Sequence, residues 1–188
     1  MKMLHISALI TLTTTLLCAT SQQEQAELIK TGKESTALLL KTLGTNMQQH
    51  MKAGGPMDAL DFCSNEAYSL TESVNKKLQE GVTVKRVSSK FRSLVNKPST
   101  DEQKVLEKLQ AQQDAGEKLP PYVLKQVNQN SYKFYKPLII EKEVCLKCHG
   151  NVTDKHLKDA IEARYPDDKA MHYKLNDLRG AVVVTITK

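Results

Sequence analysis

Hydrophobic residues recur at helical spacing through the first part of the chain. Over residues 22–52, apolar side chains return every three or four positions among good helix formers, and Gly54-Gly55-Pro56 stops the pattern. A second helix is expected over residues 57–79, because Pro56 suits a first helical position and a glycine follows the end. Its inward positions are Ala59, Leu60, Phe62, Cys63, Ala67, Leu70 and Val74. The pattern therefore predicts two consecutive helices, with Cys63 on the buried stripe of the second.

The rest of the chain alternates between strand-like and helical patterns. Ser99 or Thr100 is placed to cap a helix, and residues 128–130 form a turn between two strands. The expected strands cover residues 82–88, 122–127, 132–140 and 180–186, and the expected helices cover 101–115 and 154–164. Helices first, followed by strands with helical interruptions, predict an α+β domain on a mainly antiparallel sheet.

The most specific motif follows the third predicted strand. Cys145-Leu146-Lys147-Cys148-His149 reads C-x-x-C-H, the signature of c-type haem attachment. Cys145 and Cys148 can each form a thioether to the porphyrin, and His149 then lies under the iron as an axial ligand. A redox C-x-x-C or half of a zinc site is the alternative, but zinc would need a second Cys or His pair at similar spacing. The motif therefore predicts one covalently attached haem c.

Haem attachment of this kind requires export, and residues 1–21 read as a secretory signal peptide. Lys2 precedes an apolar run from Leu4 to Leu17, small residues follow, and the segment contains no acidic residue. The run is too short to span a bilayer as a stable helix. Cleavage would leave residues 22–188 as a single periplasmic domain with no transmembrane segment. Lipid anchoring through Cys18 is a less favoured alternative, because the residue before it is bulkier than a lipoprotein signal prefers.

The charge pattern argues against a nucleic-acid partner. The formal net charge is +6, and it becomes +5 without the signal peptide, which holds one basic residue. These charges are spread along the chain rather than gathered in a block, as expected for a solvated surface. A modest basic bias still favours docking to an acidic partner. Trp is absent and aromatic residues make up 5% of the chain, so a haem would form a large share of the apolar interior.

Cys63 is the one cysteine that neither the signal peptide nor the C-x-x-C-H motif accounts for. An odd cysteine in an exported protein needs an explanation. Ala59 and Ala67 lie four residues before and after it, and these small side chains leave room for a large flat group to approach the thiol. From its position alone, Cys63 fits an iron ligand and an inert buried cysteine equally well.

The chain resembles a known family, the exported c-type haem domain with a PAS-like fold and His/Cys axial ligation, long known only as a domain of unknown function. Four blocks carry the resemblance, namely residues 59–63, residues 84–92 with Asn96 and Pro98, residues 145–150, and a final block of residues 165–170, Tyr173 and residues 177–181. The resemblance implies that Cys145 and Cys148 hold the porphyrin, with His149 and Cys63 as the axial ligands. The family usually has glycines near the positions of His172 and Asn176, and this chain departs there.

Other residues compete for the second axial position or contact the haem edge. The rivals of Cys63 are His50, Met47, Met51, His156 and His172, of which His172 is the strongest. Arg86, Arg92 and Arg179 lie in the matched blocks and are candidates to pair with haem propionates, because guanidinium binds carboxylate in a bidentate manner. Ordinary surface charge is the alternative for all three arginines.

These ligands favour a redox or small-gas sensor rather than an enzyme. A thiolate stabilises ferric iron and lowers the reduction potential, so reduction is expected to weaken the Cys63 bond and open the iron to a diatomic gas. The sensor role rests partly on analogy with other PAS-like folds, and it needs an unidentified redox or signalling protein partner. A periplasmic electron carrier is the alternative. A haem peroxidase is less favoured, because no distal His–Arg pair is evident in the sequence.

Overall fold

The computed structural model describes the backbone of residues 10–188 and the side chains of residues 22–188. The predicted signal peptide, with Cys18, lies outside the described side chains. Within the described part, five α-helices, a short 3₁₀ helix and four strands form an α+β fold. None of the described helices has the length and apolar character needed to cross a membrane.

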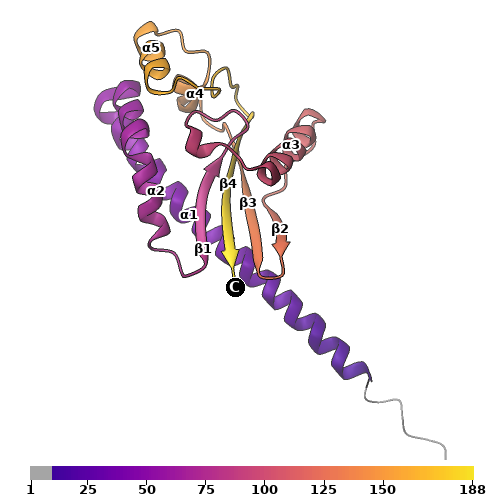
Figure 1. The fold of residues 1–188 in the computed structure, drawn as a ribbon. Coiled ribbons are helices and arrows are strands. Elements are labelled where there is room, and N and C mark those ends of the chain that lie inside the picture. Colours follow the sequence, from indigo (N-terminus) through magenta and orange to yellow (C-terminus); the bar gives the residue numbers. More distant parts are fainter. Residues whose placement is uncertain (1–9) are drawn as a thin grey trace, which may run out of the picture.

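The four strands form one antiparallel sheet in the order β1-β4-β3-β2. These strands are β1 (Val82–Val87), β2 (Val123–Asn128), β3 (Ser131–Ile139) and β4 (Leu178–Thr187). The last strand of the sequence lies in the middle of the sheet, between β1 and β3 (Figure 1). β4 is apolar along most of its length because both of its faces are covered.

One face of the sheet packs against α1 (Ile10–Asn65) and α2 (Ala67–Asn75). Alternate β4 residues Val182, Val184 and Ile186 point to this side, as the period of a strand requires. α1 crosses the sheet closely at Gly32, where an added methyl group would overlap the ring of Phe134. A glycine at this position therefore allows the helix to lie directly on β3.

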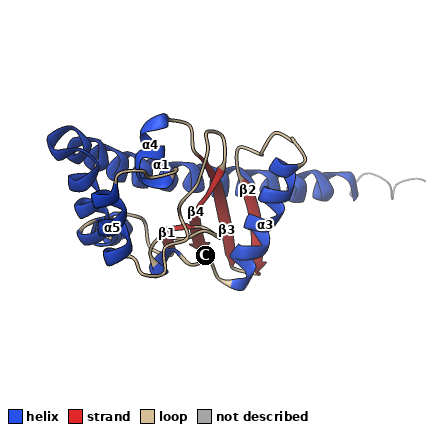
Figure 2. Ribbon diagram, turned by 90° about the horizontal axis from the view of Figure 1, so that it is seen from above, coloured by secondary structure: helices blue, strands red, loops and turns tan. Residues whose placement is uncertain are grey.

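The opposite face packs against α3 (Thr100–Asp114), as Figure 2 shows from above. Ser99 caps this helix, because its side chain accepts a hydrogen bond from the Glu102 N–H while the Glu102 carboxylate accepts one from the Ser99 N–H. The Glu102 carboxylate is fully buried between α3 and the sheet, where it pairs with Lys85 of β1 and Lys133 of β3. The predicted cap is confirmed, and it also anchors α3 to the sheet.

A third group of elements covers one end of the sheet. The helices α4 (Glu143–His149) and α5 (Lys155–Arg164) lie there beside the last turns of α1 (Figure 1). Leu60 of α1 packs with Leu157 and Ile161 of α5, and Cys148 of α4 contacts this cluster. The 3₁₀ helix η1 (Leu94–Asn96) follows β1. The C-x-x-C-H motif is therefore held between the last turns of α1 and the end of the sheet.

Three local predictions differ from the structure. The predicted break at residues 54–56 is a kink at Gly55, whose φ of 72° is non-helical, and helix resumes at Pro56 without a connecting loop. The second predicted helix is interrupted at Glu66 and ends at Asn75, whose side chain accepts a hydrogen bond from the Val84 N–H at 2.7 Å. The C-x-x-C-H motif also forms a short helix that the sequence pattern did not indicate.

Candidate functional site

The residues selected from the sequence converge on one cavity of about 390 Å³. It lies between the second half of α1 and the elements α2, β1 and α4, and its volume is within the size range of protein sites for small molecules and cofactors. All of the selected site residues line it, namely Cys63, Arg86, Arg92, Cys145, Cys148, His149 and Arg179. Residues as far apart in sequence as Cys63 and Arg179 are thus brought together by the fold.

Much of the cavity wall is apolar. Helix α1 contributes Leu40, Leu43 and Phe62, and Leu138 of β3 adds to the same surface. Ala59 and Ala67, the small neighbours of Cys63, also line the cavity and are themselves buried. An apolar wall with a few converging polar groups is typical of a cofactor site.

His149 is held at the end of α4 in one defined orientation. Its Nδ1 lies 2.9 Å from the carbonyl oxygen of Ala170, which can only accept, so Nδ1 carries the proton and Nε2 keeps its lone pair. Burial lowers the pKa of His149 well below its usual value, and the nearby positive charges of Arg179 and Arg92 lower it further. A neutral imidazole with Nε2 available is the form that binds a metal.

The loop before β4 fixes the backbone around His149. The Tyr173 N–H donates to the His149 carbonyl at 2.9 Å, and the His172 N–H donates to the Gly150 carbonyl at 3.0 Å. His172 and Asn176 have positive φ values of 63° and 71°. The resembling family usually has glycines near these positions, whereas here two non-glycine residues adopt the left-handed conformation.

Cys63 faces the cavity rather than the packed core. The prediction that it lies on a buried stripe is wrong, because its side chain is exposed and lines the cavity while Ala59 and Ala67 are buried on either side. Desolvation by the surrounding protein nevertheless raises the pKa of the Cys63 thiol, and the positive charges of Arg86 and Arg92 partly oppose this rise. These arginines favour the thiolate form that an iron ligand requires.

Arg86 and Arg179 are positive charges without acidic partners in the part of the chain whose side chains are described. Among the described side chains, neither guanidinium forms a salt bridge, although Arg179 Nη1 donates to Ser88 Oγ at 2.8 Å and to the Lys90 carbonyl at 3.1 Å. Burial lowers the pKa of both arginines. Such charges are costly unless an anion joins them.

Arg92 differs from the other two because the protein already satisfies most of its donors. Its Nε and Nη2 bind the carboxylate of Asp168 at 3.2 and 3.1 Å, and Nη2 also donates to the Cys148 carbonyl at 2.7 Å. The guanidinium therefore connects the C-x-x-C-H helix to the loop before β4. This arrangement resembles a structural clamp more than an open anion site.

Only some of the rivals of Cys63 for the second axial position line the cavity. Met47 and Met51 line the cavity. His50 lies outside its lining, where its Nδ1 is 3.1 Å from Asp58 and its ring stacks on Phe62. His156, in the first turn of α5, is exposed, and neither it nor His172 lines the cavity.

Tyr165 is a cavity residue to which the sequence analysis gave no role. Burial and the nearby Cys63 thiol raise its pKa to about 12, so its phenol stays protonated. It follows α5 and begins the fourth block of the family resemblance, which was the one sequence signal that could have selected it.

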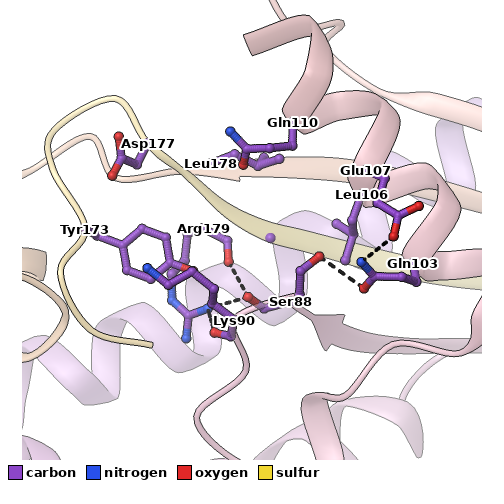
Figure 3. A pocket seen from close by; sticks show the side chains of 12 residues that line it. Ser88, Lys90, Gln103, Leu106, Glu107, Gln110, Tyr173, Asp177, Leu178 and Arg179 are labelled. Carbon is purple, nitrogen blue, oxygen red and sulfur yellow. Dashed lines mark hydrogen bonds between the residues drawn. The ribbon is translucent and has the colours of Figure 1, made fainter. Parts of the chain in front are cut away.

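A second cavity of about 470 Å³ lies on the α3 side of the sheet (Figure 3). Lys90, Tyr173 and Arg179 line one part of it, and Gln103 and Gln110 of α3 line another. Arg179 lines both cavities, so this side chain lies at the boundary between them.

Comparison with known proteins identifies the family of the chain. The model of the Tll0287-like family matches residues 17–187, so the chain belongs to this family. A structure of the cyanobacterial haem protein Tll0287 is similar, with a TM-score of 0.58 and 19% sequence identity over 88% of this chain and 96% of that chain. No curated protein matches the chain. The predicted α+β fold and the resemblance to a haem-domain family are thereby confirmed.

Proposed function

We propose that the chain binds one haem in the 390 Å³ cavity, attached through Cys145 and Cys148, with His149 and Cys63 as axial ligands. The observation that carries this proposal is the convergence of all four side chains on one cavity. Membership of the Tll0287-like family and the likeness to a haem protein support it. The orientation of His149 also supports it, because the Nδ1 bond to Ala170 leaves Nε2 available.

The chemistry of the residues that line the cavity fits a haem. The apolar wall from α1 and Leu138 would cover the porphyrin face, and Arg86 and Arg179 offer positive charge for the two propionates. The bound haem would supply an iron that changes between ferric and ferrous states. Arg92 is expected to contribute less to propionate binding, because Asp168 already neutralises it.

The proposed role is redox or small-gas sensing by an exported, non-enzymatic protein. Cys63 as a thiolate would favour the ferric state and keep the reduction potential low. After reduction the same side chain is expected to leave, and a diatomic gas such as carbon monoxide or nitric oxide could then bind. Cys63 lies between the Gly55 kink and the interruption at Glu66, so its movement would act on a short helical segment. An unidentified protein would receive the signal.

A periplasmic electron carrier is the second candidate. Two protein ligands on opposite sides of one iron would suit electron transfer without ligand exchange, and the basic charge would favour an acidic redox partner. A peroxidase is less favoured, because His149 is the sole histidine among the described residues that line the cavity. Binding of carbon monoxide or nitric oxide to the ferrous protein favours the sensor, whereas fast, salt-dependent electron exchange without gas binding favours the carrier.

Covalent attachment can be tested with the full chain expressed together with a c-type haem maturation system. The wild type is expected to retain about one haem per chain through denaturation and acidic acetone extraction, measured by the pyridine haemochrome spectrum. A Cys145→Ala, Cys148→Ala double variant should lose this haem, and Cys63→Ala, as the matched cysteine control, should keep it. Release of all haem from the wild type by the extraction would contradict attachment through the two cysteines.

A further inference from the structure

One backbone carbonyl oxygen of the site lies within hydrogen-bonding distance of two donors. The carbonyl of Ala170 accepts a hydrogen bond from His149 Nδ1 at 2.9 Å, and Arg92 Nη2 lies 3.3 Å from the same oxygen. This second contact is a long, shared one, because the two N–H groups of Nη2 also have the Cys148 carbonyl at 2.7 Å, Asp168 Oδ2 at 3.1 Å and Met171 Sδ at 3.2 Å as acceptors. Ala170 is fully buried, so water does not compete for this oxygen. The hydrogen bond to the ring of His149 therefore shares its acceptor with a guanidinium.

Asp168 holds the guanidinium in this position. Its Oδ2 lies 3.1 Å from Arg92 Nη2, and both side chains are less than 10% exposed. Its Oδ1 accepts from Arg92 Nε at 3.2 Å and from the Ala170 N–H at 2.8 Å. The carboxylate thus fixes both the arginine and the peptide whose carbonyl the histidine uses.

The strength of the His149 hydrogen bond determines how much electron density its imidazole can give to a metal. A stronger acceptor at Nδ1 makes the ring more basic and a better donor, which favours the ferric state. A second donor on the same carbonyl withdraws electron density from the oxygen and weakens it as an acceptor. Arg92 therefore acts on Nε2 through Ala170 without touching the metal position.

We propose that Arg92, held by Asp168, is a positioning residue that tunes His149 through the shared Ala170 carbonyl and keeps the reduction potential of the site from falling further. This role rests on the proposed haem function. It assigns Arg92 a purpose different from that of Arg86 and Arg179, which lack acidic partners among the described side chains.

Two conservative variants should act in opposite directions. Arg92→Lys keeps the positive charge but replaces the guanidinium fork with a single ammonium group. The lysine can therefore keep the ion pair with Asp168 while it loses the contact with the Ala170 carbonyl. The freed carbonyl would bind His149 more strongly, and the potential should fall. Asp168→Asn keeps an acceptor for the Ala170 N–H but removes the negative charge that pairs with Arg92. Arg92 should then donate more strongly to the Ala170 carbonyl, and the reduction potential should rise.

The test uses the purified full chain and two readouts. Spectroelectrochemistry should show shifts of opposite sign for Arg92→Lys and Asp168→Asn, each about threefold in the ferric-to-ferrous equilibrium, which for one electron is on the order of 30 mV. Proton NMR of the ferrous protein under carbon monoxide, which is low-spin and diamagnetic whether the gas or Cys63 fills the sixth position, should show the His149 Nδ1–H signal moving downfield in Arg92→Lys and upfield in Asp168→Asn. Lys90→Gln is the matched control, because Lys90 Nζ donates to the next carbonyl, that of Met171, at 2.8 Å.

The outcomes separate this role from a merely structural one. Opposite shifts in both readouts, with the Lys90→Gln signal at its wild-type position, support the proposal. An unchanged His149 Nδ1–H signal in both variants overturns it, as do potentials that move together in one direction. If the chain carries no haem, the proposed function fails by itself, and the Nδ1–H signal of the haem-free chain still decides whether Arg92 acts on His149.

Discussion

Two neighbouring residues of β1, Lys85 and Arg86, differ in whether the described part of the chain provides an acidic partner for their charge. Lys85 reaches the buried carboxylate of Glu102 at 3.0 Å, and Lys133 of β3 reaches the same group at 2.8 Å. Burial alone would raise the pKa of Glu102, but hydrogen bonds from Lys133, the Ser99 N–H and Lys85 lower it to about 2. This buried acid is therefore fully compensated by the folded chain itself.

Arg86, the next residue along β1, faces the cavity, where Arg179 is the second unpaired cation. Neither has an acidic partner among the described side chains, and burial lowers the pKa of both. The difference indicates that one charge cluster is completed by folding, whereas the other needs an anion from outside the chain. We infer that the Glu102 cluster supports the framework, and that the unpaired Arg86 and Arg179 mark the side of the cavity that binds an anion.

The largest effect on stability is expected from removing Glu102, the acid of the cluster in which folding pairs every charge. Glu102→Ala leaves Lys85 and Lys133 without their buried partner and removes the capping box of α3. The free energy of unfolding, measured in urea, should fall by about 3–5 kcal/mol. Glu107→Ala on the same helix is the control, because Glu107 is exposed and its loss should change stability by less than about 0.5 kcal/mol. Equal effects of the two variants would refute a special role for the buried acid.

A smaller effect on stability is expected at Arg86, and its sign should differ between the haem-free and the haem-loaded protein. In a chain that cannot retain haem (Cys145→Ala with Cys148→Ala), adding Arg86→Met should raise the free energy of unfolding by about 1 kcal/mol, because an uncompensated charge leaves a poorly solvated site. In the haem-loaded protein the same change should lower it by about 1–3 kcal/mol, because a propionate loses its partner. Urea unfolding of both forms measures the pair of values. A loss of stability in both forms would mean that the folded chain alone compensates Arg86.

The smallest effect concerns the loop that fixes His149. His172 has a φ of 63°, a conformation that costs a non-glycine residue roughly 1–2 kcal/mol. His172→Gly should therefore stabilise the protein by up to about 1 kcal/mol in thermal unfolding, after the entropy cost of glycine is counted. Its absorption spectrum should not change, because His172 does not line the cavity. A changed Soret band would instead support His172 as the axial ligand.

Sequence periodicity predicted most of the architecture, because burial of apolar faces determines it. The four strands, α3, α5 and the cap at Ser99 agree with expectation to within about two residues, the usual uncertainty of element ends. The kink at Gly55 and the end of α2 at Asn75 were not predictable in the same way. They depend on a single backbone conformation and on one side-chain bond to β1.

The candidate site was predictable as a set of residues but not as an arrangement. The C-x-x-C-H motif and the family resemblance selected seven residues that all line the cavity, but they gave no role to Tyr165. They could not separate Arg92 from Arg86 and Arg179, because the partner that distinguishes it, Asp168, lies 76 residues away in sequence. The same limitation explains why Cys63 was expected on the buried stripe of its helix, since helical spacing does not distinguish a packed face from the wall of a cavity.

The ferric absorption and EPR spectra of the wild type, compared with those of Cys63→Ala, test the central claim most directly. Met51→Leu, which changes another residue of the cavity wall, is the matched control. If Cys63 is the second axial ligand, we expect a low-spin, thiolate-ligated spectrum in the wild type and in Met51→Leu, and its loss in Cys63→Ala with the haem content unchanged. Identical spectra in all three proteins would contradict it and exclude Cys63 as the second axial ligand.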